Sequence, residues 1–570
     1  PPTLLSSTPM ERRAPVAPAD EIDLYVRTYS SLLRSTGDVD VRAFEETHAF
    51  SASSLHEGAL SADIDASAFA YAAGRLPLHM PRVKRLVLGQ SHELFEAAGY
   101  MFREWTVVKA RGRRRPMRWD GRDTLGVVIA SASDIDDLVP IVTVYQIEWN
   151  KMHARVRTLR PGAPAPDVAA ALGLAPEAFE KLVEAFGPAS FDDALLAVIS
   201  APLDLKIRML AASHSQYQRA AQRWWSGVEP VYLRGSAARR PVYFVSSNTH
   251  AIANLVGGFA RARRDAIVQW IRDTNPEDLA PVLDRAMATG DEAESAPILH
   301  YLLRAWIHAD ATGGRMAEVR AFEGQGGFSH VSIPGNVEVD AQFVEIAKLD
   351  PARLDPRLRV PGVEKLQASD AVIINIDYPL GMAAYYLLSR LGQGVGDLRG
   401  VYVMGKAATL NGRVGDVALA SACYDEHSRN TFLFQNAFRA EDVAPWLRHG
   451  SVFDNQSALT VRSAFLQNRR YMTAFYRDGY TVLEMETGPF LGATYELIYP
   501  HALPIDEIVH LSNKTPFDLG FLHYASDTPY SRRQSLLSKS LSYFGVDSTY
   551  ACAIAIVRRI FSREIARTSG

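Results

Sequence analysis

Two glutamates at the end of one β-rich run are the residues whose type and spacing most directly suggest chemistry. Glu484 and Glu486 flank Met485 directly after the run 480–483, whose composition predicts a strand. Because residues i and i+2 of a strand share one face, we expect both carboxylates to converge on one side. A sugar diol suits such a pair, since each carboxylate accepts hydrogen bonds from hydroxyl groups. The same spacing is also typical of two solvated glutamates at a strand end.

A second group of residues combines a strand end with small side chains. Gly405 and Lys406 follow a predicted strand at residues 400–404, and Gly415 and Asp416 open the next predicted strand. Small residues allow a ligand to approach the backbone closely. We therefore expect a ligand near this turn, although ordinary α/β loops share this composition.

A third candidate is an acid at the end of the predicted strand 520–525. Ser526 and Asp527 follow that strand, and Arg532 and Arg533 come shortly afterwards. An acid in this place could protonate a leaving group, and an arginine could set the pKa of that acid. We take Arg533 as the candidate for this role and Arg532 as its alternative. Both arginines are also typical of a solvated helix start.

Composition restricts the classes of protein to which the chain could belong. Its 570 residues exceed one ordinary core, which predicts two or three domains. A net charge of −3 supplies no basic field for nucleic acid, and no apolar run is long enough for a membrane span. Two cysteines do not make a disulfide framework, so we expect a reducing, cytoplasmic setting.

Motifs of several other enzyme classes are missing from the sequence. It contains no His-Glu-x-x-His, no clustered cysteines and no Gly-x-Ser-x-Gly, so we expect neither a metal site nor serine-esterase chemistry. The glycines at 392, 394 and 396 follow a predicted helix, whereas a dinucleotide fingerprint follows a strand. We therefore expect no cofactor.

The N-terminal part of the chain is expected to mix helices with strand–turn–helix units. Residues 21–110 have a mostly helical pattern, and we interpret the basic run 111–118 as a solvated loop, with a phosphate-contacting loop as the alternative. The run 124–130 predicts a buried strand. Ser131, Ser133 and nearby aspartates could bind a ligand there or cap the next helix, and we favour capping.

A glycine-rich stretch that ends at Gly327 is where we place the main domain boundary. Residues 1–20 would form a flexible tail, residues 21–327 a large, mostly helical α/β domain, and residues 328–570 a second α/β domain. In this last part strands and helices alternate. The predicted elements are strands at 371–376, 400–404, 417–421, 482–486, 507–511 and 520–525, and helices at 381–391, from 487 to 499 and from about 534.

Residues 371–558 resemble the purine nucleoside phosphorylase and nucleosidase superfamily, and AMP nucleosidase is nearest in layout. The resemblance implies a three-layer domain with a mixed central sheet. It also implies cleavage of the N-glycosidic bond of a purine nucleoside or nucleotide, within nucleotide metabolism, by a homo-oligomer. Small-molecule nucleosides or nucleotides would be the partners, without nucleic acid, membrane or cofactor. The residues that carry the resemblance are Gly405, Gly415, Asp416, Glu484, Met485, Glu486, Ser526 and Asp527.

The resemblance implies a role for each matching residue. Glu486, together with Glu484 and Met485, would bind the ribose hydroxyls, and Asp527 of the Ser526-Asp527 pair would act at the purine N7. Carboxylates near the sugar would stabilise the positive charge that develops on it. Arg533 would then tune the acid at position 527.

The chain also departs from the family pattern on the phosphate side. The arginine that holds phosphate in the phosphorylases is missing, and Lys406 could replace it only as a point charge. The Gly-rich turn of the family is replaced by Asp377-Tyr378-Pro379-Leu380-Gly381. These changes favour hydrolysis over phosphorolysis. A phosphate-dependent phosphorylase and a non-catalytic nucleotide-binding module are the alternatives.

Two further assignments stay open at this point. A nucleophilic water needs a base, and Asp377, Glu426 and His427 are all candidates. Phe453 is a candidate to stack on the base of the substrate, and a phenylalanine of the hydrophobic core is the other interpretation.

Overall fold

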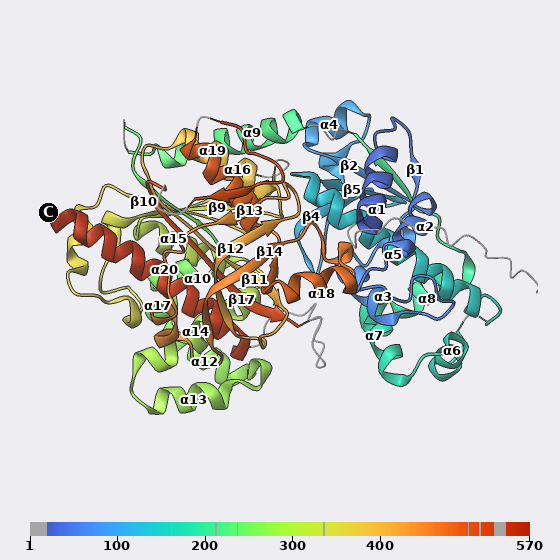
Figure 1. Cartoon of the computed structure of the whole chain (residues 1–570). Coiled ribbons are helices and arrows are strands. Elements are labelled where there is room, and N and C mark those ends of the chain that lie inside the picture. Colours follow the sequence, from blue (N-terminus) through green and yellow to red (C-terminus); the bar gives the residue numbers. More distant parts are fainter. Residues whose placement is uncertain are drawn as a thin grey trace, which may run out of the picture.

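Two β-sheets flanked by helices organise the chain in its computed structural model (Figure 1). One sheet has six strands and the other has eleven. The fold is therefore mixed α/β, as the alternation of strands and helices predicts. The structure describes residues 20–160, 162–210, 214–235, 238–333, 337–499, 501–511, 515–528 and 543–569.

The first sheet is built around the buried strand that the apolar run 124–130 predicts. In order across the sheet, the strands are β1 (Val39–Asp40), β6 (Lys206–Met209), β2 (Arg85–Gly89), β5 (Thr124–Val128), β4 (Arg113–Trp119) and β3 (Thr106–Ala110). β6, β2 and β5 are parallel, and every residue of β5 is buried.

Strand β4 corrects the expectation of a solvated loop at residues 111–118. β4 pairs antiparallel with β5, and its arginines reach buried carboxylates of the helix that follows β5. Pairing with a central strand and with these carboxylates outweighs the cost of bringing a basic run into a sheet. Charge patterning alone carries no information about such partners.

Helices cover the first sheet and carry its hydrophobic core. The longest is α5 (Ala132–Val156), whose N-terminus has a capping box between Ser131 and Asp134. The favoured role of these polar residues, helix capping, is thereby confirmed. The other helices of this part are α1 (Asp20–Leu32), α2 (Arg42–Phe50), α3 (Ala66–Ala73), α4 (His92–Ala97), α6 (Ala165–Leu172), α7 (Pro176–Phe186) and α8 (Phe191–Ser200). The next helix, α9 (His214–Tyr232), packs mainly against the second sheet.

The second sheet is larger and mixes parallel with antiparallel pairs. Its strands follow the order β16 (Ile508–His510), β13 (Thr431–Leu433), β12 (Val417–Asp425), β14 (Val452–Thr460), β15 (Tyr480–Glu484), β11 (Leu398–Thr409), β7 (Val242–Ser246), β10 (Val372–Ile376), β9 (Ala341–Glu345) and β8 (Phe328–Val331). The remaining strand, β17 (Asp518–Asp527), pairs with both β11 and β12.

Strand β11 joins the two parts of this sheet because it is long. Its first half pairs with β7, and its second half pairs with β15, while β17 runs along its other edge. β15 pairs with β14, β14 with β12, and β12 with β17, so these strands and β11 close into a ring. Closure removes the exposed edges of these strands and concentrates strand ends at one place.

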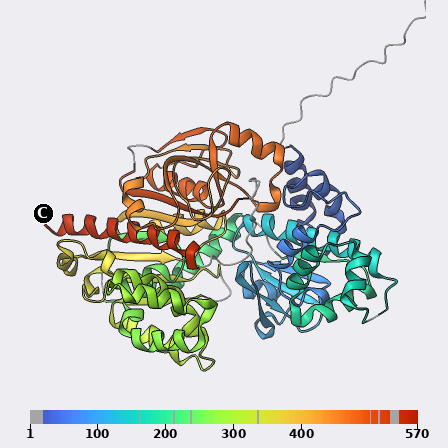
Figure 2. The same ribbon diagram turned by 90° about the horizontal axis from the view of Figure 1, so that it is seen from below.

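Helices lie on both faces of the open part of the second sheet. Val242 and Phe244 of β7 pack with α9, α16 (Ala383–Gly394) and α19 (Thr487–Ile498), whereas Tyr243 and Val245 pack with α10 (Ala251–Gly257) and α20 (Tyr543–Ser569). A separate helical group has its own core and lies away from the first sheet (Figure 2). The remaining helices are α11 (Phe259–Ala262), α12 (Arg264–Thr274), α13 (Ala280–Ala288), α14 (Glu292–His308), α15 (Gly314–Gln325), α17 (Ala440–Val443) and α18 (Arg469–Arg477).

The expected boundary near Gly327 falls inside the set of segments that build the second sheet. β7 precedes Gly327 by many residues, yet it lies between β11 and β10 in the middle of that sheet. We propose that the two sheets divide within residues 210–241 instead. The expected start of the last helix, near residue 534, lies outside the described residues, and α20 is described from Tyr543.

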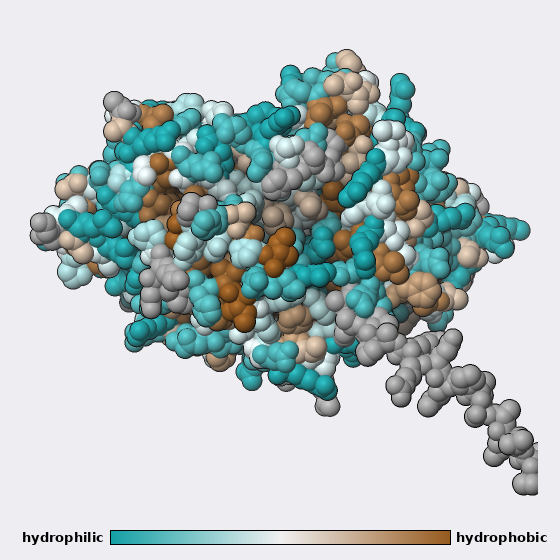
Figure 3. Space-filling model, turned by 45° about the horizontal axis from the view of Figure 1, so that its top comes forward, coloured by the Kyte–Doolittle hydropathy of each residue, from teal (hydrophilic) through white to brown (hydrophobic). Residues whose placement is uncertain are grey.

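The surface is that of a protein whose apolar residues are mostly inside. On the face in Figure 3, apolar side chains lie in small groups among hydrophilic ones. Within the part of the chain that the structure describes, no helix has both the length and the apolar character needed to cross a bilayer.

Candidate active site

The three stretches that suggested chemistry meet near the C-terminal end of β11. Ala408 of β11 pairs with Leu483 of β15 on one side and with Asp527 of β17 on the other. Neighbouring strands are about 4.8 Å apart, so the backbones of Leu483 and Asp527 are roughly 10 Å apart across β11. The Glu-Met-Glu stretch and Asp527 therefore lie on opposite sides of the segment that contains Gly405 and Lys406.

Glu484 points into the protein and caps the helix that follows it. One carboxylate oxygen accepts a hydrogen bond from the Thr460 hydroxyl, and the other accepts from the backbone N–H groups of Glu486 and Thr487, both at 2.7 Å. The side chain is buried, and burial raises its pKa. Both oxygens are thus used inside the fold, at the N-terminus of α19, where a carboxylate is stabilising.

Glu486 takes a different direction from Glu484. β15 ends at Glu484, and Glu486 stands at the N-cap position of α19 with φ −122° and ψ −22°. The alternation of side chains along a strand therefore stops before Glu486. The carboxylates of Glu484 and Glu486 have different hydrogen-bond partners and do not converge as expected. Glu486 is half-buried, and its Oε1 accepts a hydrogen bond from the Gly381 N–H at 3.4 Å. Met485 packs between them against apolar residues of β14 and α18.

Ser526 and Asp527 form a connected pair at the end of β17. The Ser526 hydroxyl donates to Asp527 Oδ2 at 2.7 Å, and Ser526 is buried. Asp527 is half-buried. Burial raises the pKa of the Tyr71 phenol on α3, and the charge of Asp527 adds to this rise. An acid held by a neighbouring hydroxyl, at a strand end and partly screened from water, is suited to proton transfer.

The turn after β10 covers the small residues of β11. A Cβ placed at Gly405 would lie 3.8 Å from the ring of Tyr378, and the Tyr378 and Tyr524 hydroxyls are 2.8 Å apart. Asp377, which precedes Tyr378, is half-buried, and its N–H donates to the Asp340 carbonyl at 2.9 Å. Lys406 is exposed on the same strand as Gly405. Tyr378 had no sequence signal of its own beyond its place after a predicted strand.

One expected site residue, Phe453, is not brought to this place, and the position of another is not described. Phe453 is 44% exposed at the start of β14, and it pairs with Ala418, whereas the other end of β14, Thr460, pairs with Glu484. Seven residues of extended strand span about 23 Å, so the backbone of Phe453 lies far from the Glu484–Glu486 end of the site. Arg533 and its alternative Arg532 lie outside the residues that the structure describes.

Glu426 and His427 belong to a buried polar cluster at the end of β12. Glu426 Oε2 accepts from the Arg462 N–H at 2.8 Å, and burial raises the pKa of Glu426 to about 7. Burial lowers the pKa of His427, and no hydrogen-bond partner of its Nε2 is present among the described residues. Arg462 Nε donates to Asp136 Oδ2 of α5 at 3.0 Å, so the cluster joins the two sheets.

Substituting Glu426 with glutamine should change how stability depends on pH. Between about pH 4.5 and 7 the folded chain holds a proton at Glu426 that the unfolded chain releases, so rising pH favours unfolding. The glutamine variant lacks this proton. Relative to wild type, its free energy of unfolding should therefore rise by about 3 kcal/mol between pH 4.5 and pH 8.

Urea unfolding of both proteins across this pH range measures the difference. Glu177→Gln, at an exposed position of α7, is the matched control and should follow wild type at every pH. Parallel curves for wild type and Glu426→Gln would contradict a raised pKa at Glu426.

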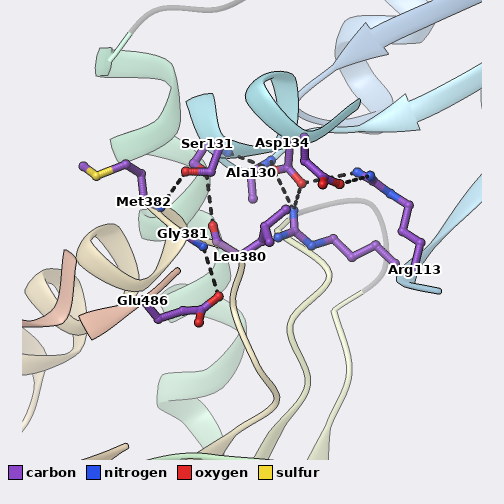
Figure 4. A network of polar contacts seen from close by, with 11 residues as sticks. Arg113, Ala130, Ser131, Asp134, Leu380, Gly381, Met382 and Glu486 are labelled. Carbon is purple, nitrogen blue, oxygen red and sulfur yellow. Dashed lines mark hydrogen bonds and ion pairs between the residues drawn. The ribbon is translucent and has the colours of Figure 1, made fainter. Parts of the chain in front are cut away.

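The first sheet contributes the N-terminus of α5 to the same region (Figure 4). Ser131 Oγ donates to the Leu380 carbonyl at 3.4 Å, and Ser133 Oγ accepts from the Met382 N–H at 2.9 Å. Asp134 is fully buried and pairs with Arg115 Nη1 at 2.7 and 2.8 Å. The polar turn after β5 therefore caps α5 and also contacts the turn that covers β11.

Comparison with known proteins gives one family match. Among solved structures, those similar to the chain include the 5'-methylthioadenosine/S-adenosylhomocysteine nucleosidases of Campylobacter jejuni (11% identity, 43% of this chain and 94% of that chain, TM-score 0.28) and S. pneumoniae (10%, 56% and 99%, TM-score 0.29). They also include the purine nucleoside phosphorylase of Toxoplasma gondii (11%, 41% and 84%, TM-score 0.27). TM-scores this low do not indicate a shared function. No curated protein matches the chain. A family of unknown function, DUF6909, matches residues 41–562, and the chain belongs to this family.

Proposed function

We propose that the chain cleaves the N-glycosidic bond of a purine nucleoside or nucleotide by hydrolysis. The observation that carries the proposal is the pairing of Ala408 with both Leu483 and Asp527. It sets a ribose-binding carboxylate, Glu486, and an acid, Asp527, on two sides of one small-residue strand segment. Such an arrangement suits a sugar and its leaving base lying across that segment.

Glu486 acts on the sugar. Its carboxylate accepts hydrogen bonds from the ribose hydroxyls, and its negative charge favours the oxocarbenium character that the sugar acquires as the bond breaks. Glu484 is assigned a supporting role, because its oxygens are already bonded to Thr460 and to two backbone N–H groups.

Asp527 acts on the base. As the bond between the sugar C1' and the purine N9 breaks, the electron pair moves into the purine, and Asp527 donates a proton or a hydrogen bond at N7. The hydrogen bond from Ser526 Oγ to Asp527 Oδ2, at 2.7 Å, fixes the orientation of this carboxyl group. Water adds to C1' and loses a proton to a base.

Asp377 is our candidate for the base that accepts the proton from water. It directly precedes Tyr378, whose ring covers Gly405, and it is half-buried. Glu426 is a weaker candidate, because its carboxylate already accepts a hydrogen bond from the Arg462 N–H. A carboxylate at position 377, with no arginine before the small-residue turn, also disfavours a phosphate nucleophile. These features support hydrolysis rather than phosphorolysis.

Incubation of the full chain with a panel of purine nucleosides and nucleotides, with and without phosphate, tests the proposal. Chromatography of the free base is the readout. We expect base release without phosphate. Strict dependence on phosphate, with a sugar 1-phosphate as product, would support the phosphorylase alternative. Binding of a nucleotide without release of base would support a non-catalytic module.

A further inference from the structure

Ser133, in the first turn of α5, lies directly beside Gly381 in the turn after β10. Gly381 has a positive φ of +51°, and a Cβ at this position would lie 2.2 Å from Ser133 Oγ. The adjacent Met382 N–H donates to the same Oγ at 2.9 Å. The serine thus takes the place of a side chain at position 381 and fixes the turn by a hydrogen bond.

The same turn contacts Glu486 from its other side. The Gly381 N–H donates to Glu486 Oε1 at 3.4 Å, while the next N–H, of Met382, points to Ser133 (Figure 4). Two consecutive amides therefore connect one residue of the first sheet with the glutamate that we assign to the sugar. Any shift of the turn would move the hydrogen-bond donor of Glu486.

Ser133 is itself held rigidly. It lies in the first turn of α5, next to the fully buried Asp134. Asp134 Oδ2 accepts from the Ala130 N–H at 2.7 Å, and Arg115 Nη1 donates to both carboxylate oxygens. A buried ion pair with several hydrogen bonds resists displacement, because breaking it would leave a charge unpaired in the interior.

We propose that Ser133 is a positioning residue that holds Glu486 through the 381–382 turn. The inference rests on the proposed function, since it takes Glu486 as the ribose ligand. The part of the chain that contains the first sheet would then orient Glu486, the sugar-binding carboxylate in the part that contains the second sheet. Recognition of the ribose hydroxyls then depends on the contact between the two sheets.

Ser133→Ala tests the inference by the ratio of kcat/KM for a ribonucleoside to that for its 2'-deoxy analogue. A misplaced Glu486 loses contact with the hydroxyls, so we expect this ratio to fall about tenfold. A general loss of stability would lower both values together and leave the ratio unchanged. Ser200→Ala, at an exposed serine of α8 whose hydroxyl donates to the Leu196 carbonyl, is the matched control.

The double variant Ser133→Ala/Glu486→Ala shows whether the serine acts through the glutamate. Glu486→Ala alone should remove the discrimination, and adding Ser133→Ala should not change the ratio further. A further, independent fall of the ratio in the double variant would overturn the proposal. So would an unchanged ratio in Ser133→Ala.

Amide hydrogen exchange separates this inference from the proposed function, because it requires no activity. Exchange at residues 380–382 should become faster in Ser133→Ala and also in Glu486→Ala, since each variant removes one hydrogen-bond acceptor of the turn. Unchanged exchange in either variant would overturn the positioning role. If exchange is faster in both variants but the wild-type chain releases no base, the contact between the turn and Glu486 is supported and the proposed cleavage reaction is rejected.

Discussion

Replacing Asp527 with asparagine should lower the rate of base release by about 10²- to 10⁴-fold, the contribution of one general acid. Asparagine has the shape of aspartate and can still accept the hydrogen bond from Ser526, which is 2.7 Å long in the wild type. It cannot give up a proton to the purine. The loss should therefore appear in kcat, with the free energy of unfolding changed by no more than about 1 kcal/mol.

Asp478→Asn is the matched control, because Asp478 is an exposed residue just after α18. It should leave both rate and stability at the wild-type values. Steady-state rates with one purine nucleoside, together with urea unfolding, measure the two quantities. An Asp527→Asn variant with the wild-type rate would remove Asp527 from the chemistry.

Glu484→Ala and Glu486→Ala should separate into a stability defect and an activity defect. Alanine at position 484 leaves the Thr460 hydroxyl and two buried backbone N–H groups without their acceptor. We expect this variant to lose about 3 kcal/mol or more of unfolding free energy. Glu486 is half-buried, and its hydrogen bond from the Gly381 N–H is long at 3.4 Å, so we expect its removal to cost less than the removal of Glu484, about 1 kcal/mol.

The activities of these two variants should rank in the opposite order to their stabilities. Among molecules that remain folded, Glu484→Ala should keep substantial base release, whereas Glu486→Ala should lose about 10²-fold or more. Thermal and urea unfolding give the stabilities, and rates per folded molecule give the activities. A stable Glu484→Ala variant that releases no base would assign the sugar to Glu484 instead.

Local features of the fold were accessible from the sequence. The apolar runs at β5, β7 and β10 predict buried strands, because a parallel strand covered on both faces reads as continuous apolar sequence. The Ser131–Asp134 capping box was equally visible, since its donors and acceptors lie within four residues. These signals need no knowledge of distant partners.

Features that depend on distant partners were not accessible. The expected boundary near Gly327 does not separate the two sheets, because β7 pairs with β10 and β11 across more than a hundred residues. The basic run on β4 was misread because its carboxylate partners lie on the helix after β5. Charge and periodicity describe a segment, whereas pairing is decided by the rest of the chain.

The residues of the candidate site also fall into those with a local signal in the sequence and those that depend on distant partners. Sequence spacing predicts Glu486 and Asp527 as site residues, and both stay predictions. It does not predict the different directions of Glu484 and Glu486, because the strand period ends where β15 ends. It could not exclude Phe453, which lies at the far end of β14 from Thr460. Ser133 and Tyr378 reach the site only through the contact between the two sheets and the turn after β10.

The most direct test of the account is the fate of oxygen when the chain acts on one purine ribonucleoside in phosphate-free water labelled with ¹⁸O. Mass spectrometry of the products is the measurement. Hydrolysis at the Glu486–Asp527 site predicts equal amounts of free purine and free sugar, with one ¹⁸O bound at C1 of the sugar as it forms. Purine that appears only after phosphate is added, together with a sugar 1-phosphate, or no purine under either condition, would contradict the account.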